Sequence, residues 1–88
     1  MNIRPFRIPQ YIHLPGATIG VRRVPRASQQ LEGDDGAWIY DPQTVQATIY
    51  IADDIRAMAR QRYVLVHELS HAMMDYLHVA LTDATVRV

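Results

Sequence analysis

The sequence predicts an α+β fold in which a small antiparallel sheet packs on one long helix. Two observations favour this fold class. Residues 45–51 alternate between apolar and polar side chains, which is typical of a half-buried strand. From Ile55 to about Val79 there is no Pro or Gly, and the apolar spacing becomes helical. At 88 residues the chain is expected to be a single domain with a thin core.

The N-terminal part of the chain is expected to contain an arm followed by one strand. Residues 1–15 include three prolines and no sustained periodicity, so we expect an extended arm. His13 lies in this arm, where an isolated histidine is more typical of the surface than of a metal site. Ala17–Val24 contains β-branched residues and is expected to be a strand that ends at Pro25.

The central part predicts a loop and then a hairpin. Residues 27–36 are polar and end in two glycines that flank two aspartates, which indicates a loop. Residues 37–40 form a short aromatic strand, and residues 41–44 have turn chemistry. We expect this strand to pair with the alternating strand at 45–51.

A helix is expected over residues 54–79, with Asp53 or Asp54 as its cap. Residues 82–88 are expected to be a strand. One stripe of side chains along the helix is expected to face the core, and its members are Leu65, Leu69, Ala72, Met73, Tyr76 and Ala80.

The chemistry of the chain is concentrated in one motif on this helix. His67 and His71 are four residues apart, so both imidazoles can reach one tetrahedral zinc ion from the same face. Glu68 follows the first histidine and is placed to accept a proton from a zinc-activated water. From Val64 to Met73 no other charge occurs, as expected for a helix that runs through a core. The alternative is a solvated helix face that bears these three residues.

Composition excludes several classes of function. Acidic and basic residues are equal in number and every basic residue is Arg, so no basic footprint for nucleic acid is present. The chain has no cysteine, which excludes disulfides and thiolate metal sites. The longest uncharged run, Ile8–Val21, is too short to span a membrane. Arg4, Pro5 and Arg7 stand where a signal peptide needs apolar residues, so we expect a soluble cytoplasmic protein.

The stretch from about Gly36 to Tyr76 resembles the ImmA/IrrE-type metallo-endopeptidases, which are compact zincins. The resemblance is carried by the hairpin strand at 36–40, the alternating strand at 47–51, the Arg-rich lead-in at 60–63 and the helix at 64–72. It implies a zincin-like fold and proteolysis of a protein substrate such as a transcriptional repressor.

The same resemblance implies roles for individual residues. His67 and His71 would hold zinc, and Glu68 would be the general base. The strand at 45–51 would lie at the edge of the cleft and offer its backbone to an extended peptide.

The usual third ligand of this family is a glutamate from a second helix downstream. Here the only glutamates are Glu32 and Glu68. Asp75, His78 or Asp83 could substitute, His78 only if the helix broke and Asp83 only from a loop beyond the helix end. The third ligand could also come from a neighbouring chain in a homodimer or from sequence beyond these residues. We favour sequence beyond these residues.

Two functions of different classes follow from the sequence. The first is a zinc-dependent metallopeptidase, or the N-terminal catalytic part of one. The second is a non-catalytic binding module that uses the same scaffold to contact a partner protein. The absence of the usual third ligand keeps the second function open, since two protein ligands leave positions for water or a partner's side chain.

Overall fold

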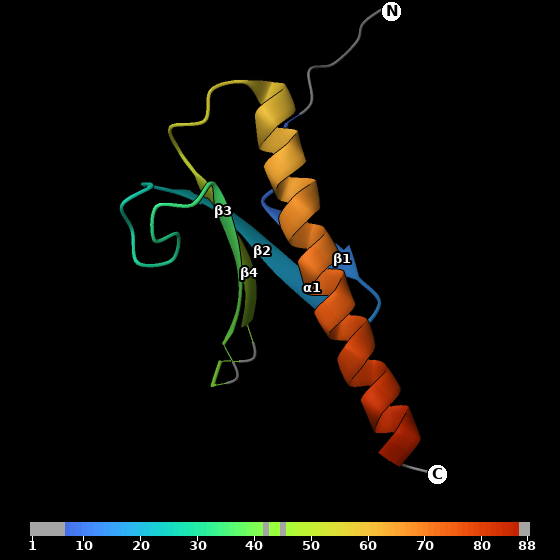
Figure 1. Cartoon of the computed structure of the whole chain (residues 1–88). Helices are drawn as coiled ribbons and strands as arrows, with labels where there is room; N and C mark the ends of the chain where they lie inside the picture. Colours follow the sequence, from blue (N-terminus) through green and yellow to red (C-terminus); the bar gives the residue numbers. More distant parts are fainter. Residues whose placement is uncertain (1–6, 42, 45, 87–88) are drawn as a thin grey trace, which may run out of the picture.

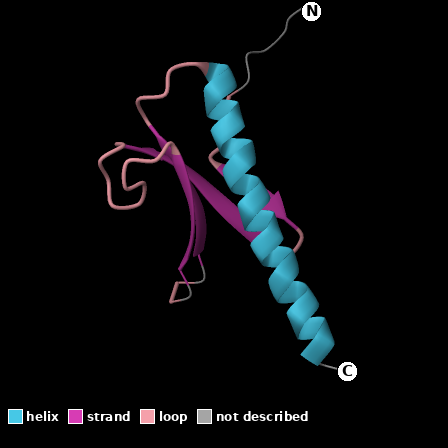
Figure 2. Cartoon of the chain, viewed as in Figure 1, coloured by secondary structure: helices cyan, strands magenta, loops and turns pink. Residues whose placement is uncertain are grey.

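The protein is an α+β fold, as the sequence predicts, in a computed structural model that describes residues 7–41, 43–44 and 46–86. Four strands, β1 to β4, form one sheet, and a single helix, α1, crosses it (Figures 1 and 2). The C-terminal part of α1 extends past the sheet (Figure 1). The elements are β1 (Tyr11–Leu14), β2 (Ala17–Val24), β3 (Gly36–Asp41), β4 (Gln46–Ala52) and α1 (Met58–Val86).

The sheet is mixed, so the expectation of a purely antiparallel sheet is wrong. Its strand order is β1-β2-β4-β3. β2 and β4 run parallel, with Ile19 opposite Ala47 and Val24 opposite Ala52. A parallel neighbour needs a long connection, which the loop after β2 and β3 together provide. Alternation and turn residues predict hairpin partners, which are neighbours in sequence, but they do not predict how two hairpins join.

The expectation of an extended arm over residues 1–15 is also wrong where the structure describes it. Residues 11–14 form β1, which pairs antiparallel with β2 from Tyr11 opposite Gly20 to Leu14 opposite Ala17. The connecting turn contains Gly16 at a φ of 80°, a left-handed conformation that favours glycine. Prolines on both sides of this short strand concealed it from the sequence pattern, and residues 1–6 lie outside the described part.

The remaining strands agree with the sequence. β2 has the predicted bounds, and β3 and β4 form the predicted antiparallel hairpin. The turn between them includes a hydrogen bond of 2.9 Å from the Gln43 amide to Asp41 Oδ1. The loop over residues 27–36 is made of turns, except that Gly36 already belongs to β3. Val45, the expected first residue of the next strand, lies outside the described residues.

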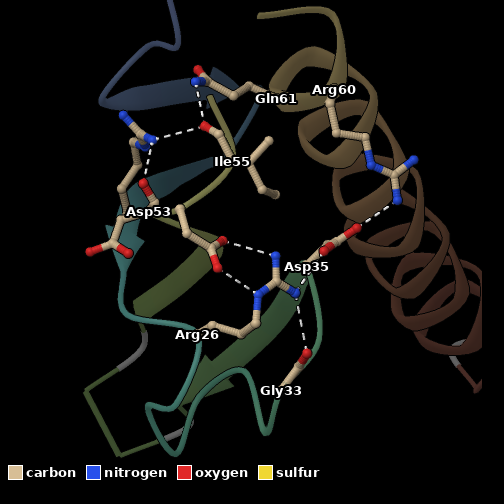
Figure 3. Close-up of polar contacts among 9 residues, drawn as sticks. Arg26, Gly33, Asp35, Asp53, Ile55, Arg60 and Gln61 are labelled. Atoms are coloured by element: carbon tan, nitrogen blue, oxygen red, sulfur yellow. Dashed lines mark hydrogen bonds and ion pairs between the residues drawn. The ribbon is translucent and has the colours of Figure 1, made fainter. Parts of the chain in front are cut away.

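Helix α1 begins later and ends later than expected. It starts at Met58 because Asp54, one of the two expected caps, binds the guanidinium of Arg26 instead. The carbonyl of Ile55 accepts hydrogen bonds from the side chains of Arg23 and Gln61, at 3.1 and 2.8 Å (Figure 3). The helix then continues through Val86, so the described part of the segment at 82–88 is helical and not a strand.

The core lies between α1 and the sheet, and it includes Ile19 and Val21 of β2 as well as residues of β4. Two members of the predicted helix stripe, Leu65 and Ala72, are buried, but Met73 and Tyr76 are 41% and 43% exposed. The buried face of α1 is therefore rotated relative to the predicted stripe, and it includes Gln61 and Val64. The largest fully buried side chains of the sheet and its loop are Leu31, Ile49 and Ile51.

Arg26 joins the loop after β2 to the connection before α1 (Figure 3). Its guanidinium donates two hydrogen bonds of 2.9 Å to Asp54 and one of 2.7 Å to Asp35. Arg60 of α1 donates to the other oxygen of Asp35 at 2.5 Å. Hydrogen bonds from Arg60 and Arg26 lower the pKa of Asp35, and those from Arg26 lower the pKa of Asp54. The loop is thereby held at two points.

Gly36 marks the closest approach of the sheet to the helix. A Cβ atom on Gly36 would lie 2.5 Å from Val64 Cγ1, 3.1 Å from Glu68 Cγ and 3.2 Å from the Tyr50 carbonyl oxygen. No real Cβ tolerates the first of these contacts, and valine is too stiff to turn away. Only glycine therefore lets β3 and α1 pack at this distance.

Gly36→Ala should destabilise the fold by about 1–3 kcal/mol, because the added methyl forces α1 away from β3. Gly20→Ala is the matched control, since a Cβ there meets its nearest atoms at 3.8 and 3.9 Å. Urea unfolding monitored by circular dichroism measures both. Equal stability of the two variants would contradict the close packing at Gly36.

Acid should weaken the fold through Asp35 and Asp54, whose pKa values are lower in the folded than in the unfolded chain. Their stabilisation is present above about pH 4 and is lost as the pH falls through the folded pKa values. Asp54→Asn should lower the melting temperature at pH 7. It should also make the melting temperature decrease less steeply as the pH falls below 4. The same change at exposed Asp34 is the control and should leave the acid limb as steep as in the wild type.

Candidate metal centre

The two histidines of the motif meet on the surface of α1. His67 Nε2 and His71 Nε2 are 3.2 Å apart, and both side chains are exposed. The rings lie edge to face, with centroids 4.7 Å apart. They face one another because α1 is continuous from Met58 to Val86 and brings residues four apart onto one face.

This spacing fits a zinc ion. Two nitrogen ligands at 2.0–2.1 Å from a tetrahedral zinc are separated by about 3.3–3.4 Å. The observed 3.2 Å between His67 Nε2 and His71 Nε2 requires only a small ring movement to match this value. The residues present therefore fit two ligand positions of a zinc site.

The histidines lie on the flank of α1 that faces the free edge of β3. Arg60 lies on the same flank, seven residues before His67 and eleven before His71, and it binds Asp35 directly before β3. On the opposite flank, the Tyr76 hydroxyl donates a 2.9 Å hydrogen bond to the Pro15 carbonyl in the β1–β2 turn. The helix thus presents its histidines along one edge of the sheet and is anchored to the hairpin at the other.

Glu68 lies between this flank and the sheet. Its side chain is half-buried, and its Cγ packs beside Gly36. Packing on one side of the stem restricts the rotamers of the carboxylate. Within the described residues, the carboxylate makes no hydrogen bond or ion pair. Glu68 is therefore held next to the histidine pair with its oxygens available.

Aromatic stacking extends the site towards the start of α1, a feature that the sequence reasoning missed. The Tyr63 ring stacks on His67, with centroids 6.1 Å apart and planes at 22°. The Arg60 guanidinium carbon lies 5.0 Å from the centre of the Tyr63 ring. The spacing of three and four residues between Arg60, Tyr63 and His67 could have indicated this column.

Among the described side chains, neither Asp75 nor His78 forms a metal-binding group with the histidine pair. Asp75 accepts a 2.9 Å hydrogen bond from the indole of Trp38 in β3. Helix α1 does not break before His78 or Asp83, so the fold-back that each required is not observed. The Asp83 side chain lies outside the described part. Across the described residues, no group of three or more metal-binding side chains occurs.

The edge strand nearest the motif is β3, which corrects the expectation for residues 45–51. That segment became β4, which pairs with β2 on one side and β3 on the other. Its backbone groups are therefore used within the sheet. β3 pairs with β4 alone, at the end of the strand order.

A hollow of about 900 Å³ lies next to β3, between the sheet and the second half of α1. Its lining includes Trp38 and Tyr40 of β3 and Ala72 and Tyr76 of α1. Aromatic and aliphatic walls of this kind accommodate apolar groups.

His13 is exposed on β1, and its Nδ1 lies 3.2 Å from the Thr18 hydroxyl.

Comparisons with family models, curated proteins and solved structures gave no match for this chain. The resemblance to ImmA/IrrE-type zincins therefore stays a prediction from the sequence motif and its flanking elements. In the described part of the chain, no helix is both long enough and apolar enough to cross a membrane.

Zinc affinity should depend on two of the four histidines. His71→Ala should weaken zinc binding on the order of 100-fold or more, because it removes one member of the pair. His78→Ala and Asp83→Ala should change the affinity by less than about threefold, since α1 keeps both residues away from the pair. His13→Ala is a further control, and competition with a fluorescent zinc chelator measures all four. A large loss in the His78 or Asp83 variant would contradict this geometry.

Proposed function

We propose that the protein is a zinc-dependent metallopeptidase with a zincin-like arrangement of sheet and helix. The observation that carries the proposal is the 3.2 Å approach of His67 Nε2 and His71 Nε2, with Glu68 beside them. These residue types at this spacing are typical of metal-assisted hydrolysis of peptide bonds. The position of the pair beside an open strand edge adds a place for a peptide.

Each residue of the motif has a defined task in this reaction. His67 and His71 would hold zinc through Nε2, and zinc supplies Lewis acidity that lowers the pKa of water. Glu68 would accept a proton from the attacking water and return it to the leaving amine. Gly36 supports this role, because it lets the sheet pack against the stem of Glu68. Stacking on Tyr63 would hold the ring of His67 in place.

The proposed substrate is an extended segment of a protein. Such a segment would add to the free edge of β3 through backbone hydrogen bonds. The hollow lined by Trp38 and Tyr40 would receive an apolar side chain of that segment. A transcriptional repressor is the kind of substrate that the resemblance implies.

A non-catalytic binding module is the second candidate function. The outer surface of α1 favours it, because Tyr63, Val66 and Met74 are 58%, 54% and 68% exposed. Large apolar side chains that gather on one surface are typical of contact sites for proteins. In that case the histidine pair would have a structural task, and Glu68 would be dispensable.

Glu68→Gln should separate zinc binding from hydrolysis. The amide keeps the size of the side chain but cannot accept the proton, so hydrolysis should fall about 10²–10⁴-fold while zinc affinity is retained. Cleavage of a library of quenched fluorescent peptides, measured with added zinc, provides the readout. Glu32→Gln is the matched control, because Glu32 is an exposed loop residue and the only other glutamate.

The result decides between the two functions. Loss of hydrolysis in Glu68→Gln alone supports the peptidase. Zinc binding without any hydrolysis that depends on Glu68 would favour the binding module. Failure of the wild type to bind zinc would reject the metal site in both.

A further inference from the structure

The two edges of the sheet are protected to different degrees. The β1 edge is only four residues long, and Pro9 and Pro15 stand next to it. Short strands and prolines are devices that prevent an edge from pairing with another chain. The β3 edge is longer, with six residues from Gly36 to Asp41; Pro42 follows it directly in the sequence, but no Lys, Arg or Pro lies within it. Ile39 and Tyr40 are 38% and 52% exposed on it.

The part of α1 that carries the histidine pair runs alongside the unprotected β3 edge. At one end of β3, Gly36 packs against Val64 and Glu68, and further along Trp38 binds Asp75. The middle of β3 therefore runs alongside the part of α1 that carries His71. A twofold axis through the middle of this edge would pass close to the histidines of both copies.

The lateral spacing also agrees with a symmetric pair. Helix α1 contacts β3 and β4 before it crosses towards the β1–β2 turn, so the part of its axis that passes these strands lies above the gap between them. Strands are about 4.8 Å apart, so the axis of α1 would be one strand spacing from the twofold axis. Two copies would place their helices about 10 Å apart, which is close to the 8–10 Å between packed helices. The two histidine flanks would face each other across this distance.

We propose that two copies of the chain pair antiparallel through β3, and that His67 and His71 of both copies hold a single zinc ion. Each copy supplies two nitrogens at a spacing that suits a tetrahedral ion. A twofold axis through the ion supplies the other two. The occupant of the open edge is thus a second copy of this chain.

Charge and sequence favour a second copy over a different partner. The chain has no net charge, so two copies do not repel each other strongly. The exposed part of β3 consists of Ile39, Tyr40 and the terminal Asp41, and apolar and aromatic residues such as the first two gain from cross-strand pairs with their own kind. An isologous contact also brings the same two ligands twice, which no asymmetric partner does without its own metal-binding residues.

The pair would be a resting form of the protein. Four histidines leave no open position on the ion, and such closed sites are structural. The pairing also occupies the β3 edge that a peptide would use. This inference rests on the proposed zinc site and not on peptidase activity. Peptide and second copy would compete for the same strand, so substrate would favour the single chain.

Zinc titration of the full chain tests the pairing directly. Native mass spectrometry should show two chains with one zinc, and sedimentation velocity should show dissociation when the zinc is chelated. One zinc per single chain, with no dimer at micromolar concentration, would overturn the proposal and leave the peptidase intact. Absence of any zinc binding would reject the zinc site itself, and with it both proposals.

Two lysine variants locate the contact. Ile39→Lys places a charge at the middle of β3, where two copies would bring like charges together. It should abolish the dimer and weaken zinc binding about 10–100-fold. Tyr11→Lys adds the same charge to the exposed β1 edge and should change neither. A zinc-linked dimer that survives Ile39→Lys, or is lost only in Tyr11→Lys, would overturn the contact through β3.

Discussion

The close approach of β3 to α1 at Gly36 determines much of the molecule. A side chain at this position would collide with Val64, so the strand and the helix can pack together only because Gly36 has none. The contact fixes α1 above the β3–β4 pair. It also sets the rotation of the helix, which turns Glu68 towards the strand and leaves His67 and His71 on the adjacent flank.

The two flanks of α1 consequently have different surroundings. One flank is tied to the sheet by Leu65 in the core and by the hydrogen bond from Tyr76 to the β1–β2 turn. The other bears the histidines and borders a strand edge with no further neighbour in the sheet. A small domain can expose a histidine pair in this way because its stability is supplied by the opposite side.

Local patterns in the sequence were sufficient for β2, for the β3–β4 hairpin and for the presence of the helix, but not for β1. The alternation in β4 and the four-residue spacing of the histidines each depend on neighbours in the chain, so the hairpin, the helix and the histidine pair could be predicted. The bounds of α1 could not. Asp54 is a good cap by type, but Arg26 binds it from a distant loop. No local pattern reveals that interaction.

The identity of the edge strand was equally hidden. The alternating segment resembled a cleft edge, yet the parallel pairing with β2 placed it inside the sheet and left β3 outside. Strand order depends on which hairpin faces which, and this is settled by packing over long separations in sequence. The stacking of Tyr63 on His67 was missed for a simpler reason, since the expectation placed Tyr63 only in the lead-in to the motif.

The parallel pairing of β2 with β4 has a consequence for the order of folding. The β1–β2 and β3–β4 hairpins each join neighbouring segments, whereas the seam between them joins residues far apart in the chain. Closing such a seam carries a large entropic cost and is slow compared with hairpin formation. The histidines, β3 and the contact at Gly36 all belong to the second hairpin and the helix that follows it. Capture of an ion by the proposed site would therefore not have to wait for closure of the seam.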